Sequence, residues 1–134
     1  YEDFDKFSDI VNELKKNGFS IAMDDFGSGY SSLNMLRQIP CDILKLDKGF
    51  INDATTDERG KIVVQHVLSM AKNLSLKTVS EGIETVEQAQ FLTDSGCDIA
   101  QGFLYAKPMP LEDFEKIAFT NNEELNIEGL KINK

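Results

Sequence analysis

Polar side chains recur at the points where apolar, strand-like segments of this sequence end. The residues concerned are Asp24, Asp25, Lys45, Asp47, Glu81 and Gln101. Buried parallel strands normally read as continuous apolar runs, so ionisable groups at one end of each strand cost free energy unless they meet partners, metal ions or substrate there. The pattern therefore predicts a binding or catalytic site where the strands end.

Two adjacent carboxylates, Asp24 and Asp25, repel each other in a confined site. Divalent cations relieve that repulsion and accept the hard oxygen ligands that Mg²⁺ and Mn²⁺ prefer. The alternative is that the pair only caps the helix that follows. The segment Gly27-Ser28-Gly29 either lets the backbone turn closely beside a ligand or forms an ordinary tight turn.

The other polar residues also leave two interpretations open. Lys45 and Asp47 share one face of a strand because side chains alternate with period two, so they form either part of a site or a structural ion pair. Glu81 could bind a metal ion or hold a water, whereas Glu84 suits the first turn of a helix. Gln101 offers both a hydrogen-bond donor and an acceptor.

The elements that must position these residues alternate along the chain. Hydrophobic spacing predicts helices over residues 5–16, 31–38, 56–73, 86–96 and 111–118 and strands over residues 19–25, 43–47, 77–80 and 98–101. Residues 50–52 are expected to connect a strand to the long helix, whose inward side chains are predicted to be Ile62, Val63, Val67 and Met70. Strands that alternate with helices pair in parallel through right-handed crossovers, which predicts an α/β fold with about four parallel strands.

Length and charge exclude several classes of protein. A chain of 134 residues is too short for a complete (βα)8 barrel, which takes about 250 residues. The formal net charge of -9 argues against DNA or RNA binding, so a phosphorylated ligand would need metal ions as intermediaries. No apolar run approaches the length of a membrane span and there is no basic start of a signal peptide. We expect a cytoplasmic location, although a parent protein could carry membrane helices elsewhere.

Four motifs, taken in order, resemble one known family. They are DDFGSGYSSL from Asp24, LKLD ending at Asp47, EGIE from Glu81, and QGFL from Gln101 with Lys107-Pro108 after it. In order and spacing they resemble the EAL family of cyclic di-GMP phosphodiesterases over about residues 1–118. Ser28 stands where the family usually has threonine, a change that keeps the hydroxyl group.

The resemblance implies a TIM-like barrel in which two Mg²⁺ or Mn²⁺ ions support hydrolysis of cyclic di-GMP to linear pGpG in bacterial signalling. By that analogy Asp24 and Asp25 are metal ligands. Lys45 orients the attacking water or stabilises phosphate charge, and Glu81 assists at the metal-bound water. Gln101 positions water or substrate, and Asp47 is a neighbour of the site.

The family's first half, with the Glu-Ala-Leu motif and further Asn and Glu ligands, has no counterpart in this sequence. We therefore expect the C-terminal half of a barrel, with a partial EAL domain over residues 1–118 and a tail over residues 119–134 that is an added strand or a loose end. The parent domain would be an enzyme, and this chain alone would have little or no activity. We also expect the chain to self-associate through its open strand edges. The alternatives to the enzyme fragment are a catalytically silent cyclic di-GMP binding or signalling module and a self-associating half-barrel with a structural role.

Overall fold

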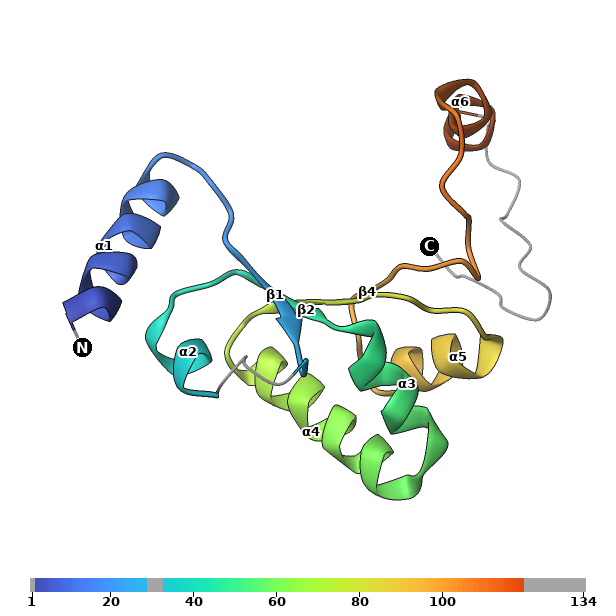
Figure 1. The fold of residues 1–134 in the computed structure, drawn as a ribbon, viewed down its shortest axis with the longest axis horizontal. Coiled ribbons are helices and arrows are strands. Elements are labelled where there is room, and N and C mark those ends of the chain that lie inside the picture. The colour runs from blue at the N-terminus through green and yellow to red at the C-terminus, as the bar shows by residue number, and fades with distance from the viewer. Residues whose placement is uncertain (1, 29–32, 120–134) are drawn as a thin grey trace.

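The computed structural model describes residues 2–28 and 33–119 (Figure 1). Six helices and four strands alternate over these residues. In chain order they are α1 (Glu2–Lys16), β1 (Ala22–Phe26), α2 (Leu33–Gln38), β2 (Ile43–Leu46), α3 (Lys48–Thr56), α4 (Glu58–Asn73), β3 (Lys77–Ser80), α5 (Val86–Asp94), β4 (Ile99–Ala100) and α6 (Leu111–Phe119). The expectation for residues 120–134 lies outside the described residues.

The four strands form one parallel sheet in the order β1-β2-β3-β4. Among the described strands, the order in space follows the order in the chain, and each strand pairs with its neighbours in that order. The predicted α/β architecture with four parallel strands is confirmed. β1 and β4 are the two edges of this sheet.

The two faces of the sheet differ in burial. Met23 pairs with Leu44 and Leu44 with Thr78, and all three are buried on the side that the helices cover. The opposite face, which we call the open face, consists of Ala22, Ile43, Lys45, Lys77, Val79 and Ile99. Each of these six side chains is exposed or only half-buried. The described core therefore covers one side of the sheet and leaves the other side accessible.

The long helical region departs from its prediction in two ways. Residues 50–52 do not form a connection, because they lie within helix α3, which Asp47 caps by accepting a hydrogen bond from the Gly49 amide at 2.6 Å. Asp57 is extended and caps α4 in the same way through Gly60, so the chain forms two helices.

The prediction of which side chains of α4 face inward was also wrong in part. Val64, Leu68 and Ala71 are buried, whereas the predicted Ile62 and Val63 are about half exposed, at 51% and 50%. Two apolar sets lie on different sides of this helix, so hydrophobic spacing alone does not identify the side that meets the sheet.

The first and last helices, α1 and α6, carry apolar faces that are largely exposed. They stand apart from the body at opposite ends of the molecule in Figure 1. Among the side chains of α1 whose burial is described, only Val11 is buried, while Phe4, Phe7, Ile10 and Leu14 are between 40% and 59% exposed. No residue of α6 is buried, and its Leu111, Phe114 and Ile117 are between 48% and 69% exposed.

Two carboxylates hold the amino-terminal ends of the strands. Asp42 accepts hydrogen bonds from the Ile21 amide at 2.9 Å and from the Lys15 ammonium at 2.7 Å. Asp98 accepts from both the amide and the hydroxyl of Thr78 at 2.8 Å. The hydrogen bond from the Thr78 amide is the main reason that the pKa of Asp98 lies below its ordinary value. Each carboxylate therefore joins one strand to the strand before it.

Replacing Asp98 with alanine should lower the free energy of unfolding by about 1–2 kcal/mol, because the buried Thr78 loses the acceptor of two hydrogen bonds. Urea unfolding at neutral pH, followed by circular dichroism, measures the change. Since the folded state lowers the pKa of Asp98, this contribution is present above the ordinary carboxyl range and is lost as the pH falls through the folded-state pKa. Asp94→Ala is the control, because Asp94 makes only an exposed contact within α5; equal losses in both variants would contradict the assignment.

Candidate active site

Three of the predicted site residues meet at the carboxyl ends of neighbouring strands. The Lys45 ammonium lies 2.9 Å from a carboxylate oxygen of Asp24 and 2.6 Å from one of Glu81. Lys45 belongs to the inner strand β2, Asp24 to β1, and Glu81 directly follows β3. We call these three residues the Asp-Lys-Glu triad. Lys45 was expected either to form part of a site or to form a structural ion pair with Asp47. Its ion pairs join it to Asp24 and Glu81 and not to Asp47.

The two carboxylates stabilise the charged form of the lysine. The hydrogen bond to Glu81, followed by the one to Asp24, raises the pKa of Lys45 above its ordinary value. The same contact with Lys45, together with the Asp25 amide, lowers the pKa of Asp24. The lysine side chain is 26% exposed, so it can reach a ligand from the open side. At neutral pH it acts as a fixed cation and hydrogen-bond donor, not as a base.

The Asp24-Asp25 pair lies at an irregular point of β1. The pairing register between β1 and β2 shifts between Met23 and Phe26, and Asp25 has a positive φ of 53°. Asp24 accepts a hydrogen bond from the Asp25 amide at 2.9 Å, and Ser28 donates its amide and its hydroxyl to the Asp25 carbonyl. Non-glycine residues adopt this conformation rarely, and strained positions of this kind concentrate at functional sites. The final glycine of the predicted turn, Gly29, lies outside the described residues.

The residues near the triad fit a divalent metal ion by donor type. Asp24, Asp25 and Glu81 offer hard carboxylate oxygens, and the Asp24 and Asp25 side chains are exposed. Within residues 2–28 and 33–119, no group of three or more His, Cys, Asp or Glu side chains is close enough to hold a metal ion. The described residues can therefore supply part of a ligand set.

Gln101 is held beside the triad through its backbone. Its amide donates to the Ser80 carbonyl at 2.8 Å, and its carbonyl accepts from the Ile83 amide at 3.1 Å. Gly102 then lies so close to Ile83 that a β-carbon at this position would come within 2.1 Å of the Ile83 carbonyl oxygen. The segment after β4 is thus fixed against the segment after Glu81, while the Gln101 side chain stays exposed.

Sequence reasoning missed two polar links at this end, which join helix α3 to the start of α5. Lys48 contacts Glu84 at 2.6 Å, and the buried Gln88 donates to Asn52 at 2.8 Å. Glu84 precedes α5, so the expected position in the first helical turn was wrong, because Thr85 is the N-cap. Thr85 followed by Gln88 is a capping-box signature, and that signal could have placed the helix start.

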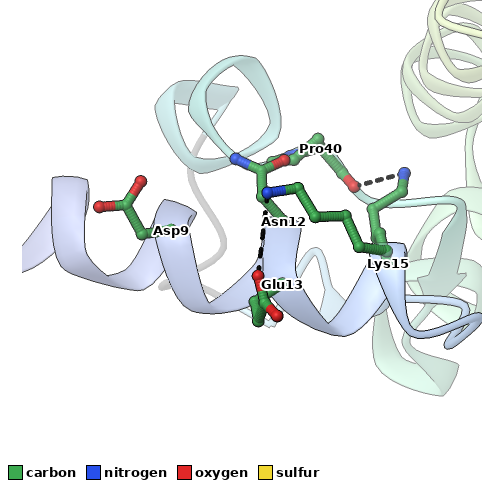
Figure 2. A pocket seen from close by; sticks show the side chains of 6 residues that line it. Asp9, Asn12, Glu13, Lys15 and Pro40 are labelled. Atoms are coloured by element: carbon green, nitrogen blue, oxygen red, sulfur yellow. Dashed lines mark hydrogen bonds and ion pairs between the residues drawn. The ribbon is translucent and has the colours of Figure 1, made fainter.

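Two grooves lie away from the triad. One, of about 780 Å³, is lined by Asp9, Asn12, Glu13, Lys15, Lys16 and Pro40. Figure 2 shows the Lys15 ammonium against the Pro40 carbonyl, a hydrogen bond of 2.9 Å. The other, of about 280 Å³, includes Thr78 and Asp98 at the amino ends of β3 and β4. Neither contains a predicted site residue.

Replacing Lys45 with methionine should raise the pKa of Asp24 toward its ordinary value, because the lysine hydrogen bond is the largest cause of the present decrease. Titration of the Asp24 carboxyl carbon by NMR measures the shift directly. Lys48→Met removes the contact with Glu84 and leaves the triad intact, so Asp24 should titrate in that variant as in the original chain. An Asp24 titration that is unchanged in Lys45→Met would show that the ion pair does not form in solution.

Replacing Asp47 with alanine should lower the free energy of unfolding by about 1 kcal/mol, since the side chain caps helix α3. Asp47→Asn keeps an oxygen acceptor at the N-cap and should lose much less. Thermal or urea unfolding of the two variants separates the capping role from the predicted role beside the site. A loss of the same size in both would mean that the negative charge, and not the cap, is what the fold requires.

Comparison with known proteins identifies the family of this chain. The family model of the EAL domain matches residues 1–108. The cyclic di-GMP phosphodiesterase NbdA of Pseudomonas aeruginosa is 42% identical over 107 residues, which cover 80% of this chain and 14% of that protein. The chain thus spans about one seventh of this relative's length.

Within the described residues, no helix combines the length and the apolar character needed to cross a membrane.

Two solved structures share the fold at substantial identity. A structure named as the PaMucR phosphodiesterase in complex with c-di-GMP is 43% identical with a TM-score of 0.73, and the match covers 82% of this chain and 44% of that one. A manganese and cyclic di-GMP complex of Klebsiella pneumoniae BlrP1 is 33% identical with a TM-score of 0.72, covering 78% of this chain and 27% of that one. With the parallel sheet and the family match over most of its length, the chain belongs to the EAL domain family.

Proposed function

We propose that this chain is one half of a metal-dependent phosphodiesterase domain that hydrolyses cyclic di-GMP to linear pGpG in bacterial second-messenger signalling. The observation that carries the proposal is the Asp-Lys-Glu triad, which lies at the carboxyl ends of three neighbouring parallel strands in a member of the EAL family. In barrels of parallel strands this end is where active sites are built. The proposed domain extends to residue 118 and the tail covers residues 119–134.

The side chains divide the chemistry between them. Asp24 and Asp25 would contribute oxygen ligands to Mg²⁺ or Mn²⁺, and a bound divalent ion lowers the pKa of a water and stabilises charge on phosphate oxygens. Lys45, held as a cation by its two partners, would donate to the attacking water or to a phosphate oxygen. Glu81 fixes the lysine and can accept a hydrogen bond from that water.

Two further residues would assist from the rim of the site. The exposed amide of Gln101 can both donate to and accept from a substrate group. Asp47 would act indirectly, because its carboxylate caps α3 directly after the strand that carries Lys45. Its replacement should therefore alter the position of Lys45 more than the chemistry itself.

Little or no turnover by this chain alone is part of the proposal. The match covers less than half of the solved MucR chain, and the described residues bring together no group of three metal-ligand side chains. A partial ligand set supports weak metal binding. We further propose a cytoplasmic location, with a parent protein that can be attached to a membrane. We also propose self-association through the outer edges of β1 and β4, which no other described strand pairs with, because open edges favour pairing with another chain.

A catalytically silent cyclic di-GMP binding or signalling module is the second candidate. It would share the parallel sheet and the nucleotide but not the chemistry. The presence of both Asp24 and Lys45 in one hydrogen-bonded group favours the phosphodiesterase, because a binding site alone does not require a lysine that is fixed between two acids.

Calorimetric titration of cyclic di-GMP into the chain with Mg²⁺ or Mn²⁺, combined with chromatography for pGpG, tests the function. The chain alone should bind weakly, only when the cation is present, and should form no detectable pGpG. Mixing it with the remaining half of a relative's EAL domain should produce pGpG, and Lys45→Met should abolish that product while binding persists. Lys61→Met, on the distant helix α4, is the control and should leave the product unchanged.

Other outcomes separate the alternatives. Tight binding without pGpG in the mixture would favour the silent module. A mixture that forms a stable complex but neither binds nor hydrolyses cyclic di-GMP would contradict both.

A further inference from the structure

A side chain from helix α3 covers the turn that follows β1. A β-carbon at Gly27 would lie 2.5 Å from Cγ of Phe50 and 2.6 Å from its Cβ, so Phe50 packs directly on the Gly27 backbone. Gly27 also has a positive φ of 103°, and both features require glycine. We propose that Phe50 is a positioning residue, which fixes this turn and thereby holds the Asp24 and Asp25 carboxylates in place for a divalent cation. The proposal rests on the metal-ligand role of these two residues in the proposed function.

The backbone of Asp25 needs support from its surroundings. Its φ of 53° costs free energy in a residue other than glycine, and such a conformation persists only where the surrounding structure holds it. Ser28 donates its amide and its hydroxyl to the Asp25 carbonyl, but these hydrogen bonds stay within the turn. The contact of Phe50 with Gly27 comes from another element, so it can fix the turn relative to the sheet.

The ring of Phe50 is itself held by Phe26, the last residue of β1. Phe26 is buried, and the two rings meet edge to face with their centroids 6.5 Å apart. Aromatic pairs favour this geometry over others, so it restricts the orientation of the Phe50 ring. The Phe26 carbonyl also accepts a hydrogen bond from the Asp47 amide at 3.1 Å, directly before α3. Phe50 is therefore a fixed support for the turn.

The first turn of α3 also packs on the loop at the other side of β2. A β-carbon at Gly82, next to Glu81, would lie 2.6 Å from Cβ of Lys48. Lys48 and Phe50 are two residues apart, or about 200° around a helix, so they reach opposite sides of it. Because β2 lies between β1 and β3, the start of α3 packs on both segments that bring an acid to the Asp-Lys-Glu triad.

The two proposed metal ligands on β1 are held in different ways. The Asp24 carboxylate contacts Lys45 at 2.9 Å, whereas the direction of the Asp25 side chain depends on its unusual backbone conformation. Return of that φ to the ordinary range would turn the side chain away from its present position beside Asp24. Groups around a metal site orient its ligands in this way without touching the ion. Loss of the Phe50 ring should therefore weaken cation binding without removing a ligand.

The experiment compares Phe50→Ala with the original full chain by NMR, without nucleotide. The first measurement is the backbone order parameter of the Asp25 and Ser28 amides, which needs no metal ion. It should be near the rigid value of about 0.85 in the original chain and fall below about 0.6 in the variant. The second is the Mn²⁺ concentration that half-broadens the Asp25 amide signal, which should rise about tenfold in the variant.

Phe91→Ala is the matched control. Phe91 is also a half-buried phenylalanine packed against the core, but it lies on helix α5. Its replacement should lower the urea midpoint and leave both NMR measurements unchanged. Phe50→Tyr keeps the ring and should behave as the original chain. If Phe50→Ala does not fold, Phe50→Leu and Phe91→Leu are compared in the same way, because leucine keeps apolar volume but has no flat ring to cover Gly27.

Three results would overturn the positioning role of Phe50. They are order parameters that stay unchanged in the Phe50 variants, equal changes in the Phe50 and Phe91 variants, and Mn²⁺ binding that persists although the turn has loosened. A different result would count against the proposed function alone. If Mn²⁺ does not broaden the Asp25 signal of the original chain, but loss of the Phe50 ring still loosens the turn, Phe50 positions the turn and the proposed metal ligands are wrong.

Discussion

The ion pairs of one lysine connect the geometry of the sheet with the chemistry of its carboxyl end. Lys45 is a cation on an inner strand and contacts an acid from the strand on each side. That arrangement requires parallel strands in the observed register, where Leu44 pairs with Met23 and Lys45 with Val79. A slip of one residue would turn Lys45 toward the helices and leave a charged group in the core. The register of the sheet and the site therefore depend on each other.

The buried side chains of strand β2 belong to the core, and its accessible side chain belongs to the site. Leu44 and Leu46 alternate with Lys45 along β2 and are fully buried under the helices. Lys45 points to the other side, where it remains accessible. A single four-residue strand thus contributes both to the core and to the site, and helix α3 begins directly after it with Asp47 as its cap.

Much of this could be predicted from the sequence, because its signals are local. Strand β3 was predicted with its observed bounds of Lys77–Ser80, and the polar residues at strand ends located the triad. Helix α3 was missed because its nine residues include Gly49 and two threonines, which have low helix propensity. The ion-pair partners of Lys45 could not be predicted from the alternation of side chains along a strand. That alternation places Asp47 on the same face as Lys45, but it does not give the distance from Lys45 to a side chain on a neighbouring strand. That distance is set by register, which depends on the packing of the whole sheet.

The carboxylates at the amino ends of the strands have a further consequence for how the chain can assemble. Asp42 binds the Ile21 amide just before β1, and Asp98 binds the Thr78 amide in β3. Each link joins a strand to the one synthesised before it, and the order of strands in space is the order in the chain. Among the described strands, each pairs with the strand that directly precedes it in the chain, so only one crossover has to close for each new pairing. The sheet can therefore grow one strand at a time in the direction in which a ribosome releases the chain.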